Sequence, residues 1–246
     1  AGTNKDEMNF WYVRSDYFYN STGGVVLRLQ RSEENLKSWI KYRSDIWRFE
    51  GAEEPLRRMA KSNENLYSYR FDWDEQNDSS FAGNYQLFVG AAHGLEIPFL
   101  TGDFDLGPIT FYVKPFLFPD ASDEGRLALS DLIMKYWANV AKYGNPNEFV
   151  RGPKWEKFTA ENNQLLILDN PVANLVEMKT MPVDKDDLLS QIEGDSALEI
   201  KERCLIGWIA ARNLHEDKRP QPPFSFCTNF TNEDLYKLRN LTEGRD

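Results

Sequence analysis

Histidine and cysteine are scarce in this sequence of 246 residues, with two of each, and basic residues are outnumbered by acidic ones. The two histidines do not lie at ligand spacing from the two cysteines, and a structural zinc site takes four such side chains, so we expect no metal site. Lysine and arginine number 29 against 39 acidic residues, which gives a net charge of −10. Surfaces that bind nucleic acid or anionic membranes need a basic footprint, so neither function is expected.

Long apolar runs are also absent. No stretch reaches the roughly 18 apolar residues that predict a transmembrane helix. The sequence opens at Ala1 without a basic segment followed by an apolar one, so we expect no signal peptide within it. A mature or cleaved protein would open in the same way, so this absence does not place the protein in the cytosol.

Aromatic residues, by contrast, are abundant, with 16 Phe, 11 Tyr and 7 Trp. Disordered chains are poor in such residues, and with 41% hydrophobic residues this chain can build a core. The sequence contains no internal repeat and no Gly/Ser-rich linker that would mark a boundary. Residues 1–246 are therefore predicted to lie within a single domain.

The two cysteines, Cys204 and Cys227, lie 23 residues apart. They form either a local disulfide or two free thiols, and the sequence leaves both alternatives open. Four N-x-S/T sequons are present, although chance produces some of these in an Asn-rich chain. Four sequons, together with a loop that a disulfide could close, predict a secreted or otherwise exported protein. The sequons begin at Asn20, Asn77, Asn229 and Asn240.

Hydrophobic periodicity predicts the main elements. The clearest is a helix over residues 123–143, where an apolar stripe recurs at steps of three and one and Gly144 stands where a C-cap belongs. Further predicted helices cover residues 33–48, 52–62 and 183–203. Predicted strands cover residues 66–73 and 164–169, the first because aromatic side chains alternate along it. Residues 74–80 are predicted to form a polar loop.

His93 follows a short apolar run and stands between Ala92 and Gly94. This pattern predicts a tight loop with little bulk around the imidazole. Such a loop either presents the imidazole to a functional site or bonds it to local backbone on the surface. His215 is surrounded by charged residues and is interpreted as a solvated surface side chain.

The blocks GTNKDE at residues 2–7 and GAAHGLEIPF at residues 90–99, followed by two later blocks, occur in the same order as in one protein family. They resemble the type-B carboxylesterase family, which includes the cholinesterases. The block at residues 90–99, GAAHGLEIPF, is similar to the histidine motif of that family. The block at residues 2–7, GTNKDE, is similar to its catalytic-acid motif. The remaining two blocks are the helical stretch at residues 129–147 and the segments 155–159 and 165–169. Together they cover the first 170 residues or so.

The resemblance implies an α/β-hydrolase fold, a central and mostly parallel sheet flanked by helices. It also implies a Ser…Glu…His triad in that chain order. Carried over, His93 is the catalytic histidine and Glu7 the catalytic acid, although Met8 stands where the family usually has Gly. The imidazole takes the serine proton, and the carboxylate fixes the imidazole tautomer. Glu96 is interpreted as a structural carboxylate that anchors the loop, and no cofactor is implied.

The sequence departs from the family in one decisive respect. The nucleophile motif G-x-S-x-G occurs nowhere in it, and Gly23-Gly24 does not match the oxyanion-hole glycines. Ser79, Ser80 and Ser130 do not stand between small residues on a strand-to-helix turn. We therefore expect the C-terminal part of a longer ester hydrolase for small-molecule substrates. Its serine would lie in an N-terminal part, which is either a separate chain produced by a nick or a segment missing from this sequence. The alternatives are a non-catalytic adhesion protein and an inactive fragment.

Overall fold

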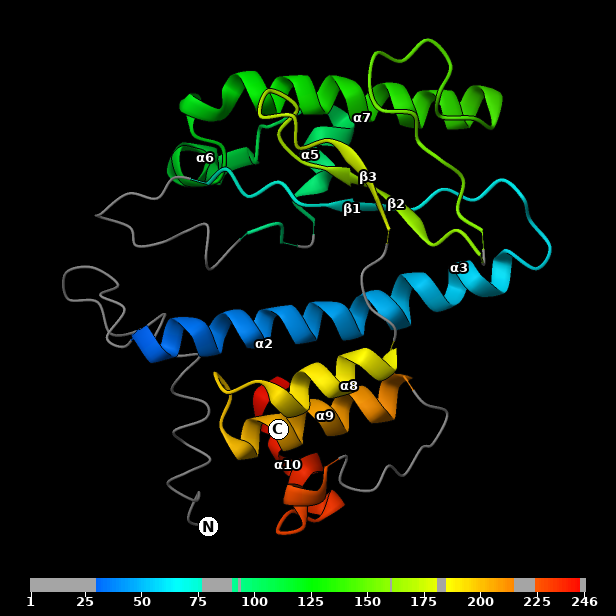
Figure 1. The fold of residues 1–246 in the computed structure, drawn as a ribbon. Coiled ribbons are helices and arrows are strands. Elements are labelled where there is room, and N and C mark those ends of the chain that lie inside the picture. Colours follow the sequence, from blue (N-terminus) through cyan, green and yellow to red (C-terminus); the bar gives the residue numbers. More distant parts are fainter. Residues whose placement is uncertain are drawn as a thin grey trace. The chain divides into compact units, whose positions relative to one another are not determined.

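The computed structural model describes residues 30–76, 90–92, 94–159, 161–180, 185–214 and 224–243 (Figure 1). Contacts within the chain separate two compact units. One consists of residues 1–55 with 182–246, and the other of residues 56–181. Each unit is described by itself, and the single domain over residues 1–246 stays a prediction.

The unit of residues 56–181 contains a small mixed sheet in the order β1-β2-β3. Its strands are β1 (Tyr69–Phe71), β2 (Gln164–Leu168) and β3 (Glu177–Thr180). β1 runs parallel to β2, with Tyr69 opposite Leu166, and β3 runs antiparallel to β2. Parallel neighbours need a long crossover connection, and here the helices α5 to α7 supply it. Both strands predicted from the sequence are present, the first over fewer residues.

β2 is buried on both faces. Leu165 and Ile167 pack in one apolar cluster with Leu66 and Phe158. Leu166 and Leu168 belong to a second cluster on the opposite face, since alternate side chains of a strand point to opposite sides. That second cluster contains residues of α5 and α7, which lie together on one side of the sheet in Figure 1. A short, continuous apolar run is what a doubly covered strand requires.

The helices of this unit are α5 (Glu96–Thr101), α6 (Thr110–Leu117) and α7 (Asp123–Tyr143), with short 3-10 turns at Gly107–Ile109 and Asp120–Ser122. α7 spans the predicted residues. It ends where Gly144, at φ 68°, donates its N–H to the Val140 carbonyl at 2.9 Å. Leu129, Ile133 and Tyr136 are buried, so the predicted apolar stripe of α7 is the face that packs.

The other unit is helical. It contains α2 (Gln30–Arg48), the π-helical turn Phe49–Glu53 and the start of α3 (Glu54–Met59). The boundary between the two units in the sequence falls within α3, after Pro55. Its C-terminal elements are α8 (Lys185–Gly194), α9 (Ile200–Leu214), a 3-10 turn at Ser225–Cys227 and α10 (Asn232–Glu243). The buried residues of α9 form the centre of its core, against apolar side chains of α2, α8 and α10.

Residues 183–203 are mostly helical as predicted, but they form parts of two helices, because the chain turns between α8 and α9. Asp195 follows the last residue of α8 and accepts the backbone N–H of Ala197 at 2.8 Å. Glu202 accepts the backbone N–H of Glu199 at 2.8 Å, so its carboxylate satisfies a donor at the start of α9. Both acids look like ordinary polar positions of one amphipathic helix in the sequence, but they stabilise the break.

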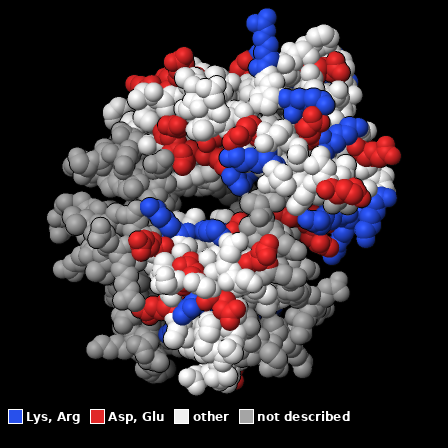
Figure 2. Space-filling view, viewed as in Figure 1, with Lys and Arg blue, Asp and Glu red and all other residues white. Residues whose placement is uncertain are grey.

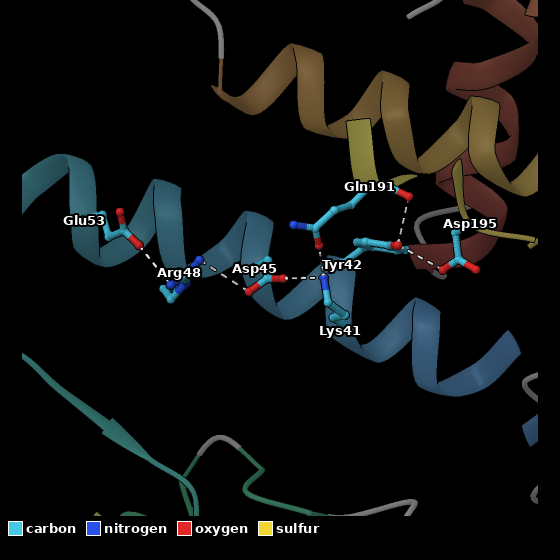
Figure 3. A network of polar contacts seen from close by, with 7 residues as sticks. All are labelled: Lys41, Tyr42, Asp45, Arg48, Glu53, Gln191 and Asp195. Carbon is cyan, nitrogen blue, oxygen red and sulfur yellow. Dashed lines mark hydrogen bonds and ion pairs between the residues drawn. The ribbon is translucent and has the colours of Figure 1, made fainter. Parts of the chain in front are cut away.

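A polar network joins α2 to α8 and the turn that follows it (Figure 3). The Tyr42 hydroxyl lies 2.9 Å from Asp195 Oδ2, to which it donates, and 3.2 Å from the Gln191 carbonyl oxygen. Burial, and then the hydrogen bond to Asp195, raise the pKa of Tyr42. Lys41 Nζ lies 2.8 Å from Gln191 Oε1 and 3.2 Å from Asp45 Oδ2. These contacts fix α2 against α8 beside their apolar contacts.

An ion pair spans the π-helical turn. Arg48 NH1 lies 3.1 Å from Glu53 Oε1, and NH2 lies 3.4 Å from Asp45 Oδ1 (Figure 3). The Glu53 side chain is 1% exposed. A buried carboxylate is tolerated only when a cation compensates it, and Arg48 provides that cation.

Cys204 and Cys227 form a disulfide, with their Cα atoms 5.7 Å apart. The bond links α9 to the 3-10 turn at Ser225–Cys227, and both cysteines are fully buried in the core of the helical unit. Of the two alternatives that the sequence left open, the structure has the disulfide.

The surface of the described residues carries charges of both signs. Figure 2 shows acidic and basic side chains interspersed on the face it displays. Among the helices of the described residues, none is long and apolar enough to span a membrane.

Candidate functional site

The predicted catalytic pair, Glu7 and His93, lies outside the described residues, as does His215. The pairing of Glu7 with His93 therefore stays a prediction. The residues that flank His93 on both sides are described, so the backbone that leads to and from the histidine can be examined.

Two of the four predicted glycosylation sites lie within the described residues. Asn20 and Asn77 lie outside the described residues. Asn229 is exposed in a turn after the disulfide, which is the accessibility that glycosylation requires. Asn240 lies in α10, and its side chain is not among those described.

The backbone turns tightly on both sides of His93. Gly90 has φ 50° and Gly94 has φ 92°, a left-handed region that glycine adopts without a steric penalty. The Leu95 N–H donates to the Ala92 carbonyl at 3.1 Å, so a hydrogen bond closes directly across the histidine position. The described residues on both sides of position 93 thus form a tight backbone turn, while the placement of His93 itself stays a prediction.

Glu96 anchors the loop on its C-terminal side. The first residue of α5, it accepts the backbone N–H of Gly94 at 2.8 Å through Oε2. Partial burial, and next the negative charge of Glu96, raise the pKa of Tyr69 on β1. The carboxylate has the structural role that was interpreted from the sequence.

Phe99 attaches α5 to the sheet and to α7. Its fully buried ring lies 5.2 Å, between ring centroids, from both Phe71 and Trp73, at and just after the end of β1. Ser130 on α7 donates its hydroxyl to the Phe99 carbonyl at 2.8 Å. The segment of residues 90–95 is called the histidine loop below. Its C-terminal side is therefore fixed to the end of β1. The Ser130 hydroxyl is buried and committed to this bond, which agrees with its exclusion as a nucleophile.

Gln76 contacts the loop on its N-terminal side. Its Nε2 donates to the Gly90 carbonyl at 2.8 Å, and the residue is 6% exposed. The sequence does not single out this residue, because residues 74–80 have the pattern of a polar loop. No local signal would have found it, since its partner is 14 residues away in the sequence.

Carboxylates gather where the parallel strands end. Asp72, Asp74 and Glu75 follow β1, and Asp169 follows β2. Burial raises the pKa of Asp169 to about 6, as do the charges of the three other acids, while the Asn170 N–H opposes the shift. No group of three or more His, Cys, Asp or Glu side chains among the described residues could hold a metal ion. The negative charges of Asp72, Asp74 and Glu75 disfavour the ionised form of Asp169, in addition to its burial.

Asp169→Asn is expected to stabilise the chain at neutral pH but not in acid. Because the folded pKa is raised above the unfolded value of 3.8, the stabilising contribution of protonated Asp169 is complete below about pH 4 and is lost as the pH rises through about 6. The neutral amide avoids that loss. We expect a gain of about 1 kcal/mol at pH 7.5, after allowance for partial exposure, and almost none at pH 4.

Chemical denaturation of the wild-type chain and the variant at the two pH values measures this difference. The exposed carboxylate Asp103 offers a matched control, since Asp103→Asn should not reproduce the pH-dependent gain. An equal effect of Asp169→Asn at both pH values would contradict the raised pKa of Asp169.

These features define an α/β protein with a small mixed sheet, in which a histidine loop is attached to the end of the first strand. Residues 17–185 match the Carboxylesterase family, and the chain belongs to that family.

Three curated proteins illustrate the similarity. A medium-chain fatty acyl-CoA hydrolase precursor of Anas platyrhynchos is 38% identical over 132 residues, which are 54% of this chain and 20% of that protein. Carboxylesterase 5A of Felis catus is 31% identical over 176 residues, covering 70% of this chain and 28% of the relative. Acetylcholinesterase of Gallus gallus is 32% identical over 102 residues, which cover 42% of this chain and 11% of that protein.

The chain thus spans between 11% and 28% of the length of these relatives. Among solved structures, a PNB esterase matches 51% of this chain and 21% of its own, at 23% identity and a TM-score of 0.33.

Proposed function

We propose that this chain is the C-terminal part of a serine carboxylic-ester hydrolase and supplies its catalytic histidine and glutamate. The observation that carries the proposal is the histidine loop. Hydrogen bonds fix the backbone on both sides of His93, at the end of a strand, in a member of the Carboxylesterase family. A general base needs such fixed placement, because proton transfer requires hydrogen-bond distance to the nucleophile.

In the proposed reaction, His93 removes the proton of a serine hydroxyl while that oxygen attacks the ester carbonyl. His93 then returns the proton to the departing alcohol, and an acyl-serine intermediate forms. Water then attacks the carbonyl of the acyl-serine, with His93 again as the base, and the carboxylic acid and the free serine are released. Glu7 orients the imidazole and stabilises its protonated form. The relatives are named as an acyl-CoA hydrolase, a carboxylesterase and a cholinesterase, which supports acyl transfer to water from a small-molecule ester.

The serine and the oxyanion hole are proposed to come from an N-terminal chain, and residues 1–246 to complete one α/β-hydrolase domain with it. Two observations support this. G-x-S-x-G is absent from these residues, while the curated relatives are several times longer than the matched segments. Large apolar side chains on α5 and α6 are also exposed, among them Ile97 at 56%, Phe111 at 82% and Tyr112 at 72%. Exposed apolar surface of this kind is typical of faces that another segment covers.

We also propose that the protein is exported. The buried disulfide and the exposed Asn229 sequon support this, since disulfides persist in oxidising compartments.

Mass spectrometry tests the two-chain arrangement. Protein purified from its source and analysed under native and then denaturing conditions is expected to release a second chain with a G-x-S-x-G peptide. A serine-directed phosphylating probe should label that peptide and abolish ester hydrolysis. A folded 28.6 kDa species without a partner, inert to the probe, would contradict the proposal and favour the non-catalytic binding protein.

A further inference from the structure

Gln76 links the histidine loop to the sheet. Its side-chain nitrogen, Nε2, donates to the carbonyl oxygen of Gly90 at 2.8 Å, three residues before His93. A carbonyl oxygen can only accept, so this contact decides which end of the amide faces the loop. The side chain is buried, and its Oε1 atom is buried without a hydrogen-bond partner among the described residues. A buried amide oxygen without a hydrogen-bond partner lowers the stability of the folded chain, so the presence of Gln76 at this position calls for a functional explanation.

The backbone that carries Gln76 is itself fixed. The Asp72 N–H donates to the Leu168 carbonyl at 2.9 Å and extends the pairing of β1 with β2 by one residue. Trp73 is fully buried against Phe99, and the Gln76 N–H donates to the Asp74 carbonyl at 2.8 Å. The amide of Gln76 therefore has a fixed position relative to the sheet, and its hydrogen bond fixes Gly90 relative to the sheet as well.

Glu96, on the other side of the histidine, has a different effect. Its hydrogen bond to Gly94 joins residues two apart, so it shapes the loop without fixing its place in the molecule. Gln76 and Gly90 lie 14 residues apart, so their hydrogen bond fixes the loop relative to β1. Phe99 provides the corresponding attachment on the C-terminal side, through its ring contacts with Phe71 and Trp73.

We propose that Gln76 is a positioning residue for His93, acting through the Gly90 carbonyl to hold the histidine loop at the end of β1. The inference rests on the proposed catalytic role of His93. Without the amide donor, the half-buried Gly90 carbonyl loses this hydrogen bond to Gln76 and the loop can shift. A displacement of about 1 Å at a catalytic group can cost about 100-fold in rate, so a 10- to 100-fold loss of kcat is expected.

The test uses the complete two-chain enzyme with Gln76→Met, which keeps the length of the side chain but removes the donor. We expect kcat for ester hydrolysis and the rate of phosphylation by the serine probe to fall together, with KM nearly unchanged. Gln164→Met is the matched control. Gln164 is the first residue of β2, at the opposite end of the parallel pair, and this variant should keep wild-type kcat.

A double-mutant cycle with His93→Ala separates positioning from a general structural effect. If Gln76 acts through His93, adding Gln76→Met to His93→Ala should not lower the residual activity further. A further multiplicative loss, or unchanged kcat in Gln76→Met while His93→Ala is inactive, would overturn the inference alone. Full activity of His93→Ala would overturn the proposed function itself. Should Gln76→Met fail to fold, Gln76→Leu gives the same test, because a leucine side chain cannot donate to Gly90.

Discussion

His93→Ala is expected to lower kcat/KM for ester hydrolysis by about 10⁴-fold or more in the complete enzyme, without unfolding it. A serine hydroxyl is a weak nucleophile until a neighbouring base accepts its proton, and alanine provides no base. The residual rate would come from substrate binding and oxyanion stabilisation by the N-terminal chain. The assay is steady-state hydrolysis of a chromogenic ester, with thermal unfolding measured in parallel.

The second histidine of the chain provides the matched control. His215→Ala removes the same side chain from a charged sequence context and should leave the turnover number unchanged. Since the chain has two histidines, these variants together test every imidazole that it contains. Wild-type turnover in His93→Ala, or an equal loss in both variants, would reject the assignment of His93 as the base.

Cys204→Ser is expected to destabilise the helical unit by about 3 kcal/mol, the second large effect. The disulfide closes a loop between residues 23 apart in sequence, and a cross-link of that span removes considerable entropy from the unfolded chain. It also ties the 3-10 turn at Ser225–Cys227 to the centre of the core formed by α9. Denaturation followed by circular dichroism measures the loss of unfolding free energy.

Two comparisons separate loss of the cross-link from other effects of this substitution. Cys204→Ala should cost about as much as Cys204→Ser if the cross-link dominates, because alanine adds no buried hydroxyl. A reductant should destabilise the wild-type chain and leave both variants almost unaffected. Titration of two reactive thiols in denaturant without reductant would show that the disulfide is absent from the protein.

Local signals were sufficient where an element is long and has its own boundary residues. α7 was predicted over its full extent, because its apolar stripe is long and Gly144 ends it. The predicted strands were placed well but extended too far. β1 comprises Tyr69–Phe71, since pairing with β2 decides how much of the aromatic alternation becomes a strand.

Short elements depended on distant contacts. α5 has six residues and contains Pro98 within its first turn, so no local pattern predicts a helix there. Burial of Phe99 against Phe71 and Trp73, and the hydrogen bond from Ser130, hold this short helix in place. The break between α8 and α9 was missed for a similar reason, because Glu202 also accepts from Asn35 of α2 at 2.6 Å.

By itself, the sequence determined the Carboxylesterase resemblance, the histidine loop, the long helix α7 and the absence of a G-x-S-x-G motif, because each is a local pattern of residues. Only the tertiary structure decided that Cys204 and Cys227 are joined, that Gln76 bonds the loop, and that burial, and then the acids after β1, raise the pKa of Asp169. These depend on distances between segments far apart in the chain, which packing of the helices and the sheet sets and no local pattern encodes.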